Sequence, residues 1–578
     1  MWKTAMLALF AAAVNSTALA QTIALQNSPA LSAVRPPAVG RINHVIIIMQ
    51  ENRSFDSYFG TFPGADGIPQ KNGEFLVCVP DPVRNTCIKP YHDPFDQNIG
   101  GPHGASNATA DVNGGKMNGF LARSKQGRTC QDILDPKCAG AIDVMGYHDG
   151  NDIANYWAYA KNFVLQDHMF EPNASWSLPE HLFMVSEWSA NCTRHDDPSS
   201  CTNALETPGF PPDFHPPRPN PIYAWTDLTY LLHDYGVSWG YYIVEGAEPD
   251  CRNDSAEDCP PIAQNAKTPG IWNPLPYFDT VKNDGELGNI QPITNFLKQA
   301  EAGTLPAVSW VVPSADVSEH PPGLVTAGQS YVTALINAVM AGPNWKDCAI
   351  FITWDDWGGF YDHVPPVSID VNGYGLRVPG LVISPFAKRG YIDHQTLSFD
   401  AYVKFIEDLF LDRQRLDPAT DGRPDPRPYV REKAPELGDL SADFDFFGQL
   451  PRPPMILPVH PSTALLSSRP AEQIALSIDA PQPQNRPVTT LTGWAIDNAS
   501  PITNVQVFID YVPAGAADYG AVRARVCSNH PDQVGCPNVG WTWSTNTATL
   551  GRGPHDLNVL VTSATGQQAT ANAPFTVP

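Results

Sequence analysis

Two short apolar runs that end in acidic and amide residues place the strongest constraint on the fold of this chain. The first is HVIIIMQ, followed by Glu51 and Asn52, and the second is CAIFITW, followed by Asp355 and Asp356. Continuous apolar runs of this length are typical of strands buried on both faces of a parallel sheet. Because ligands bind at the edge where such strands end, we expect these four side chains to lie together there.

Three carboxylates at one sheet edge indicate a bound cation, because buried like charges are costly unless they are neutralised. Oxygen ligands suit Mg, Ca or Mn, and nearby histidines would admit Zn or Fe. We therefore predict a divalent metal ion, of a kind that the sequence does not identify, held by Glu51, Asn52, Asp355 and Asp356. The alternative is that each polar set only caps the helix or turn that follows it.

Further apolar runs alternate with helical patterns along the first three quarters of the chain. Strands are predicted at residues 162–167, 237–245, 305–313 and 376–387, and helices at 226–236, 327–342 and 398–412. Thr226 is the expected N-cap of the first of these helices. Alternating strands and helices predict an α/β fold, an α/β/α sandwich around a mostly parallel sheet.

The ends of the chain have a different composition. Residues 1–20 have a Lys near the start, an apolar stretch and an Ala-Leu-Ala ending, which predicts a signal peptide and a secreted or periplasmic protein. No later segment has the ~20 apolar residues of a membrane span. After a catalytic domain at 40–450 and a proline-rich linker at 451–471, short alternating runs predict an immunoglobulin-like β-sandwich at 472–578. This sandwich is either a spacer or a carbohydrate-binding or surface-binding module.

The cysteines also favour an oxidising compartment. Ten of the eleven form close couples that predict disulfides: Cys78–Cys87, Cys130–Cys138, Cys192–Cys201, Cys251–Cys259 and Cys527–Cys536. Cys348 is left over at the start of a buried strand and is expected to be a core thiol. The formal net charge of −24 argues against nucleic acid and against electrostatic docking to anionic lipid.

Ser177 is the candidate nucleophile, since it precedes a helical pattern whose N-terminal N–H groups would face an anionic ester. Its rivals are Ser175 and Ser186, and the alternative is an ordinary N-cap serine. Three loop histidines are candidates for phosphate binding or for protonation of a leaving group: His103, His320 and His363.

The segments HVIIIMQENRSFDSYFG, GPHGASN, SLPEHLF, SEHPPG and TWDDWGGFYDHVPP, in this order, resemble the secreted bacterial phosphoesterase family of phospholipases C and acid phosphatases. The resemblance covers about residues 40–450 and implies an alkaline-phosphatase-like fold. It implies that the four strand-end residues bind the metal and that Ser177 forms a phosphoserine. It also implies that Asn52, His103 and His320 contact the phosphoryl group, while His363 binds substrate or supports its loop.

Two departures bear on the substrate. At the position of Ser177, the phospholipase C members of this family carry Thr, whereas the acid phosphatases carry Ser as this chain does. At the position of Glu180, an Asn is common in the family. The favoured function is a metal-dependent phospholipase C-type phosphodiesterase acting on a phosphate ester such as a phospholipid headgroup. The alternatives are an acid phosphatase for phosphomonoesters and a non-catalytic surface-binding protein. The sequence leaves the headgroup and the oligomeric state open.

Overall fold

The computed structural model describes residues 41–82, 86–127, 140–209, 219–252, 260–447, 451–466, 473–479, 488–510, 512–530 and 533–577. The predicted signal peptide at 1–20 and the predicted disulfide Cys130–Cys138 lie outside these ranges, and so does Cys259 of the predicted disulfide Cys251–Cys259.

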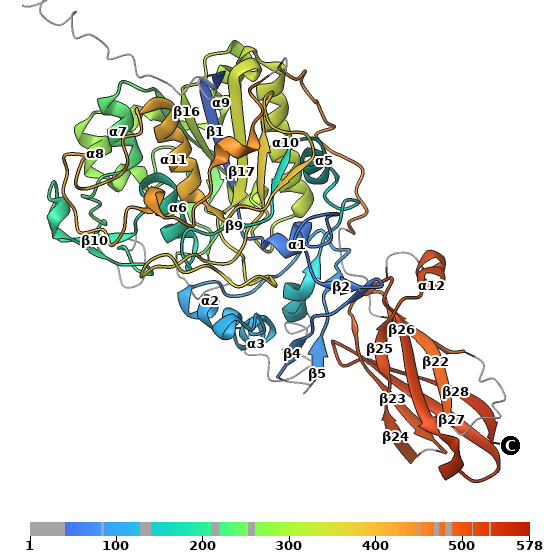
Figure 1. Cartoon of the computed structure of the whole chain (residues 1–578). Helices are drawn as coiled ribbons and strands as arrows, with labels where there is room; N and C mark the ends of the chain where they lie inside the picture. Colours follow the sequence, from blue (N-terminus) through green and yellow to red (C-terminus); the bar gives the residue numbers. More distant parts are fainter. Residues whose placement is uncertain are drawn as a thin grey trace, which may run out of the picture.

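An eight-stranded mixed sheet forms the centre of the larger part of the molecule (Figure 1). In spatial order its strands are β15 (Ile290–Pro292), β12 (Trp239–Ile243), β16 (Val308–Val312), β1 (His44–Gln50), β17 (Cys348–Trp354), β18 (Gly380–Ile383), β8 (Val164–Gln166) and β19 (Tyr391–Asp393). The pairings are parallel except where β18 runs against β17 and β8. The predicted strands and the mostly parallel sheet are therefore confirmed.

Burial explains why these runs form strands. Every residue of β12, β16, β17 and β18 is buried, because helices cover both faces of the sheet. Strands in such a position need apolar side chains on both faces, which is why their sequences lack the polar alternation of a half-exposed strand.

Two groups of helices cover the sheet, and Figure 1 shows α5 and α10 on the opposite side from α6, α7 and α11. The helices are α5 (Ala154–Asn162), α6 (Ser177–Ser186), α7 (Leu228–Asp234), α8 (Asp279–Asn283), α9 (Ile293–Ala302), α10 (Val325–Ala341) and α11 (Phe399–Phe410). The predicted N-cap of α7 is wrong by one residue: Asp227, not Thr226, accepts the hydrogen bond from the Thr229 N–H. An Asp carboxylate caps a helix N-terminus as well as a Thr hydroxyl does, so the sequence alone does not choose between Asp227 and Thr226.

A smaller layer lies at the carboxyl edge of the sheet, below it in Figure 1. It contains α1 (Phe55–Phe59), α2 (Ala105–Val112), α3 (Phe120–Gly127) and the short strands β2 (Gln70–Lys71), β3 (Glu74–Phe75), β4 (Val79–Asp81), β5 (Thr86–Ile88), β6 (Tyr91–His92) and β7 (Gly146–Tyr147). Its core packs Phe95, Phe120 and Val144 against Trp357, which follows β17. This packing fixes the loops of the layer against the strand ends.

The remaining short strands belong to loops around the same edge. They are β9 (Met169–Phe170), β10 (Ala190–Cys192), β11 (Cys201–Asn203), β13 (Gly246–Ala247), β14 (Ala263–Gln264) and β20 (Leu397–Ser398). Strands β13 and β14 pair only with each other and not with the main sheet.

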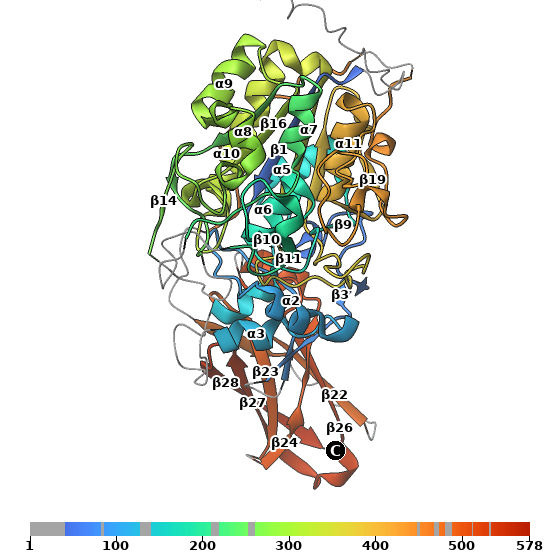
Figure 2. The same cartoon turned by 90° about the vertical axis from the view of Figure 1, so that its left-hand side faces the viewer.

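The C-terminal part consists of two four-stranded antiparallel sheets. One contains β21 (Ile474–Ile478), β22 (Val488–Asp497), β26 (Gly540–Asn546) and β25 (Asp518–Ala521), and the other β24 (Val512–Ala516), β23 (Ile502–Ile509), β27 (Gly553–Ser563) and β28 (Gln568–Val577). Trp541, Val507 and Val559 belong to one buried cluster that joins both sheets. This part, which also contains α12 (Ala524–Asn529), lies at one end of the molecule in Figures 1 and 2, beside the β4–β5 hairpin.

The proline-rich segment before these sheets lies against the larger part. The Leu457 N–H donates to Asn337 on α10, the side-chain amide of Asn155 on α5 donates to the Pro458 carbonyl, and the Leu466 N–H donates to the Pro94 carbonyl. Its described residues therefore pack along α5 and α10.

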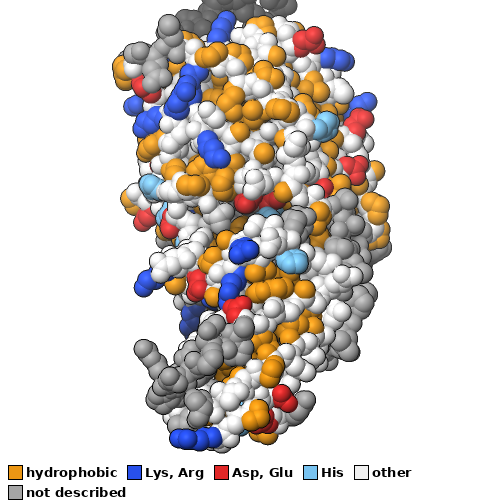
Figure 3. Space-filling view, turned by 90° about the vertical axis from the view of Figure 1, so that its right-hand side faces the viewer, with side chains coloured by type: hydrophobic (Ala, Val, Ile, Leu, Met, Phe, Trp, Pro, Cys, Tyr) orange, Lys and Arg blue, Asp and Glu red, His pale blue; other side chains and the backbone are white. Residues whose placement is uncertain are grey.

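Disulfides join Cys78 to Cys87, Cys192 to Cys201 and Cys527 to Cys536. Cys348 is a buried free thiol whose pKa is raised by burial. None of the helices in the described ranges has the length and apolar character that crossing a membrane requires. On the face shown in Figure 3, Lys and Arg side chains are scattered among apolar and acidic ones.

Candidate active site

The two acidic strand ends meet because β1 and β17 are adjacent and in register. Gln50 pairs with Trp354, so Glu51 and Asp355 leave the sheet at the same level. The Asn52 N–H donates to Asp355 Oδ1 at 3.0 Å. The predicted convergence at the sheet edge is therefore present.

A tight crossing of two backbones holds Asn52 and Asp356 together. The Asn52 side-chain amide donates to Asp356 Oδ1 at 2.8 Å, and the Gly358 N–H donates to the same oxygen at 2.7 Å. Asn52 has φ of 54° and Gly358 has φ of 59°. A Cβ on Gly358 would lie 2.8 Å from the Asn52 Cβ, so only glycine fits this crossing.

His181 completes a three-residue group with the strand-end acids. One ligand atom each from Glu51, His181 and Asp355 lies within 4.8 Å of the other two, and His181 Nε2 is 3.5 Å from Glu51 Oε1. His181 was not predicted as a ligand. The signal was present, however, because His181 follows Ser177 by four residues and so shares its face of a helix.

The unsatisfied atoms of this group fit a divalent cation. Among the described residues, Glu51 Oε2, Asn52 Oδ1, Asp355 Oδ2 and His181 Nε2 have no hydrogen-bond partner, although all four residues are buried. Burial lowers the pKa of His181 to about 4, so its imidazole is neutral and able to donate a lone pair. Buried polar atoms rarely stay unpaired, and three oxygens with one nitrogen form a suitable donor set.

The electrostatics also favour a positive charge at this place. Burial, and then the nearby Asp355, raise the pKa of Glu51 well above its usual value. Burial also raises the pKa of Asp356, and Asp355 adds to this effect while His103 opposes it. A cation would relieve both the desolvation and the repulsion.

Ser177 is the first residue of α6, and its fully buried hydroxyl faces the acids. Its Oγ donates to Asp356 Oδ2 and to Asp250 Oδ2, each at 3.4 Å. The rival serines are engaged elsewhere, since Ser175 Oγ donates to Glu206 Oε2 and Ser186 Oγ donates to the Leu182 carbonyl. The geometry therefore favours Ser177 as the nucleophile.

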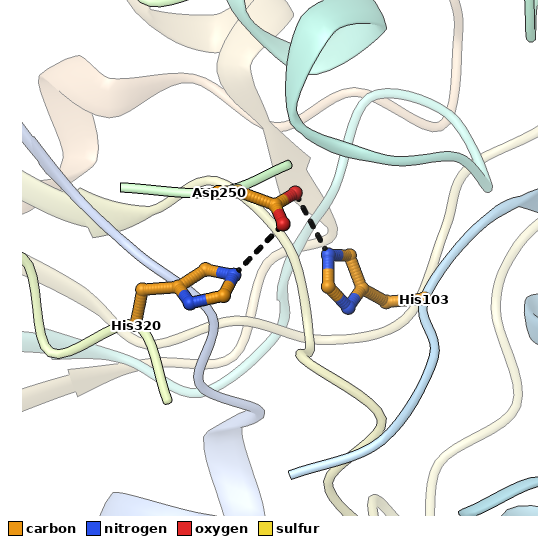
Figure 4. Close-up of side chains that lie close together, drawn as sticks. All are labelled: His103, Asp250 and His320. Carbon is orange, nitrogen blue, oxygen red and sulfur yellow. Dashed lines mark hydrogen bonds and ion pairs between the residues drawn. The ribbon is translucent and has the colours of Figure 1, made fainter. Parts of the chain in front are cut away.

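His103 and His320 lie on two sides of one carboxylate, that of Asp250 (Figure 4). His103 Nε2 is 3.1 Å from Asp250 Oδ2, and His320 Nε2 is 3.1 Å from Asp250 Oδ1. Burial opposes the charged form of His103, but Asp356 and Asp250 outweigh it and raise its pKa well above the usual value. Sequence analysis missed Asp250, which lies in a loop and follows no strand of the main sheet.

Glu319 supports the loop that carries His320. Its carboxylate accepts hydrogen bonds from the Tyr58 hydroxyl at 2.7 Å, the Tyr156 hydroxyl at 2.6 Å and the Trp354 indole at 3.1 Å. Burial raises the pKa of Glu319 to about 7. With φ of 72°, Glu319 holds a backbone conformation that its three donors stabilise.

His363 lies in a different cluster from the other two histidines. Its Nδ1 is 2.8 Å from Asp56 Oδ2, and Arg377 contacts both Asp56 and Asp362. These contacts favour support of the loop over contact with substrate.

Glu180, which the sequence marks as an added charge, is fully buried near a second acid, Glu171. No described residue donates a hydrogen bond to either oxygen of Glu180, and burial and then Glu171 raise its pKa well above the usual value. Burial and the neighbouring acids therefore favour the protonated, neutral form of Glu180.

A profile of the Phosphoesterase family matches residues 42–411. Non-hemolytic phospholipase C of Pseudomonas aeruginosa is 27% identical over 493 residues, which cover 75% of this chain and 61% of that protein. Its counterpart from Burkholderia pseudomallei is 26% identical, with 71% of this chain and 60% of that protein covered. Phospholipase C B of Mycobacterium tuberculosis is 26% identical, with 70% of this chain and 78% of that protein covered. The chain thus spans about 60% of the length of the first two relatives.

Among solved structures, a protein in the alkaline phosphatase superfamily from Vibrio parahaemolyticus aligns with 84% of this chain and 82% of its own, at 9% identity and a TM-score of 0.28. The family profile, in contrast, spans more than half of the chain, from just before β1 to the end of α11. The chain therefore belongs to the Phosphoesterase family.

Proposed function

We propose that this protein is a secreted, metal-dependent phosphoric ester hydrolase with Ser177 as its nucleophile. The observation that carries the proposal is the position of Ser177 Oγ, buried at the N-terminus of α6 and 3.4 Å from Asp356. The N-terminal N–H groups of a helix stabilise an anion at that place. Family membership and relatives named phospholipase C support the same reaction class.

Glu51, Asp355 and His181 would hold the metal ion, with Asn52 and Asp356 beside them. A divalent ion at this place supplies a positive charge that neutralises phosphoryl oxygens and favours the ionised serine hydroxyl. The donor set suits Mg, Ca or Mn, and His181 would also admit Zn or Fe.

The residues of the chain divide the chemistry between them. Ser177 Oγ attacks phosphorus and gives up its proton to a neighbouring carboxylate, for which Asp356 is placed. The bond from phosphorus to the leaving oxygen breaks, and that oxygen takes a proton from a protonated histidine. His103 is suited to this role because the nearby Asp356 and Asp250 raise its pKa and so favour its protonated form. Water then hydrolyses the phosphoserine and restores the Ser177 hydroxyl.

A phospholipase C-type diester is the proposed substrate, and a phosphomonoester is the alternative. The names of the relatives support the diester. The family resemblance in the sequence implies that Ser177, at a position where phospholipases C carry Thr, is shared with acid phosphatases. We further propose an alkaline-phosphatase-like catalytic domain at 40–450, a linker at 451–471 and an immunoglobulin-like domain at 472–578.

Two matched chromogenic esters test the proposal: an aryl phosphate and the corresponding aryl phosphorylcholine. Initial rates are measured with the purified protein as isolated, after chelation, and after divalent ions are restored one at a time. Preference for the phosphorylcholine, lost on chelation and regained with one metal, is the expected result. Preference for the phosphate makes the protein a phosphatase, and no hydrolysis under any condition overturns the proposal.

A further inference from the structure

The Asp250 carboxylate is held by the donors that, under the proposed function, bind the phosphoryl group. Oδ2 accepts from Ser177 Oγ at 3.4 Å and lies 3.1 Å from His103 Nε2, while Oδ1 lies 3.1 Å from His320 Nε2 (Figure 4). A hydroxyl and two imidazole nitrogens that surround one buried carboxylate form a pattern with which proteins bind phosphoryl oxygens.

Both histidines have their second ring nitrogen engaged as well. His103 Nδ1 is 3.0 Å from the Gly101 carbonyl, and His320 Nδ1 is 2.6 Å from the Pro321 carbonyl. These backbone carbonyls orient the rings, a role that a carboxylate has in other hydrolases. Asp250 is therefore not needed for orientation, and it occupies the nitrogens that would face substrate.

The cavity next to His103 and His320 is small. It is lined by Asn52, His103, His320 and Gly358 among others, and its volume of about 10 Å³ is the space of a single water molecule. A phosphoryl group with its oxygens needs several times this volume, and the two histidine nitrogens that would contact it are the ones that Asp250 meets.

The described residues around Asp250, 248–252, lie outside the main sheet. They follow β13, which pairs only with β14. Their contacts include the buried ion pair between Glu248 and Arg252 and the hydrogen bond from the Cys251 N–H to Asp250 Oδ1 at 2.5 Å, and Cys251 is disulfide-bonded.

From these contacts we infer that Asp250 is an internal anion that competes with the phosphoric ester for Ser177, His103 and His320. The closed state seen here is self-inhibited, and substrate binds as Asp250 withdraws. This inference rests on the proposed function, since it takes these three residues as the ester-binding groups. The site's affinity for any phosphate is then reduced by the free energy needed to displace Asp250.

The test compares the metal-loaded protein with the variants Asp250→Asn and Asp250→Ala. Calorimetry with inorganic phosphate gives the dissociation constant, and the aryl phosphorylcholine assay gives kcat and KM separately. We expect both variants to bind phosphate at least about tenfold more tightly and to show a lower KM. Glu301→Gln removes the same charge at an exposed position of α9 and should change none of these values.

Other results overturn the inference in identifiable ways. Weaker or unchanged phosphate binding refutes competition, and a fall in kcat at constant KM makes Asp250 part of the chemistry instead. Loss of one bound metal equivalent, by elemental analysis, makes Asp250 a cation ligand with His103 and His320. Asp250→Asn keeps the shape of the side chain and decides the question if Asp250→Ala does not fold. Because phosphate binding needs no turnover, it remains decisive even if no ester is hydrolysed.

Discussion

Ser177 and Asp356 face each other across the carboxyl edge of the sheet, with Ser177 Oγ 3.4 Å from Asp356 Oδ2. One residue begins α6 and the other follows β17, so 179 positions of sequence separate them. The contact places a hydroxyl at a helix N-terminus beside the buried carboxylates of the proposed metal site, a combination suited to phosphoryl transfer to a side chain.

Replacing Ser177 by Ala should lower kcat at least about 10³-fold, because no other described serine hydroxyl faces the acids. Metal content, by elemental analysis, and the melting temperature should stay near the parent values. Ser175→Ala is the matched control, since Ser175 donates to Glu206 outside this group, and it should keep most of the activity. Near-normal turnover in Ser177→Ala would refute the covalent role.

Glu51→Gln should have opposite effects with and without metal. With metal, the loss of a charged ligand should weaken binding about 10–100-fold, as measured by calorimetry. Without metal, the same change should raise the melting temperature, because it removes a buried charge that Asp355 repels. A variant that melts earlier in chelator and binds metal normally would show that Glu51 is no ligand.

Metal binding itself should stabilise the folded chain. A ligand at about 100 times its dissociation constant contributes about 2.7 kcal/mol, so the melting temperature should rise with metal concentration. Differential scanning calorimetry across a metal titration checks this. The rise should vanish in Asp355→Asn and persist in Glu301→Gln, whose side chain is exposed on α9. An equal rise in melting temperature in Asp355→Asn and Glu301→Gln would show that the ion binds elsewhere.

His320 and His363 should separate in function, because only His320 lies beside Asp250. We expect His320→Gln to lower kcat about 10²-fold or more. His363→Gln should instead lower the free energy of unfolding by about 1 kcal/mol, through its lost bond to Asp56, with kcat/KM changed less than about tenfold. Steady-state kinetics and urea titrations on both variants provide the comparison. A large rise in KM for His363→Gln alone would make His363 a substrate contact.

Glu187 should make the protein less stable as the pH rises. Burial, and then Glu432 and Asp400, raise the pKa of Glu187 well above 4.5 in the folded chain. Between 4.5 and that raised pKa, the folded state holds a proton that the unfolded state has released, so the free energy of unfolding falls as pH rises.

Glu187→Gln removes this titration. The variant should be more stable than the parent by about 1–3 kcal/mol at pH 8, and the difference should shrink toward pH 4.5. Urea titrations at several pH values measure it, with the exposed Glu301→Gln as control. The prediction would be contradicted if the free energies of unfolding of the parent and of Glu187→Gln differed by the same amount at every pH.

Local pattern was enough to predict the strands and their acidic ends, and it made Ser177 the candidate nucleophile. An apolar run such as HVIIIMQ has few alternatives to a buried strand, and parallel strands end at a common edge. Strand direction was harder to predict: β18 is as apolar as its neighbours, yet it alone among the eight strands runs antiparallel to β17. The run carries no signal for direction, because both directions bury the same side chains.

The tertiary structure decided which side chains meet. The sequence determined the sheet edge, its carboxylates and the serine, because these follow from short-range periodicity and from the chemistry of residue types. Only the folded chain could bring His181 to Glu51, set His363 apart with Arg377, and place Asp250 between His103 and His320. Asp250 belongs to a loop whose path is fixed by packing and hydrogen bonds to distant residues, and no local pattern encodes such contacts.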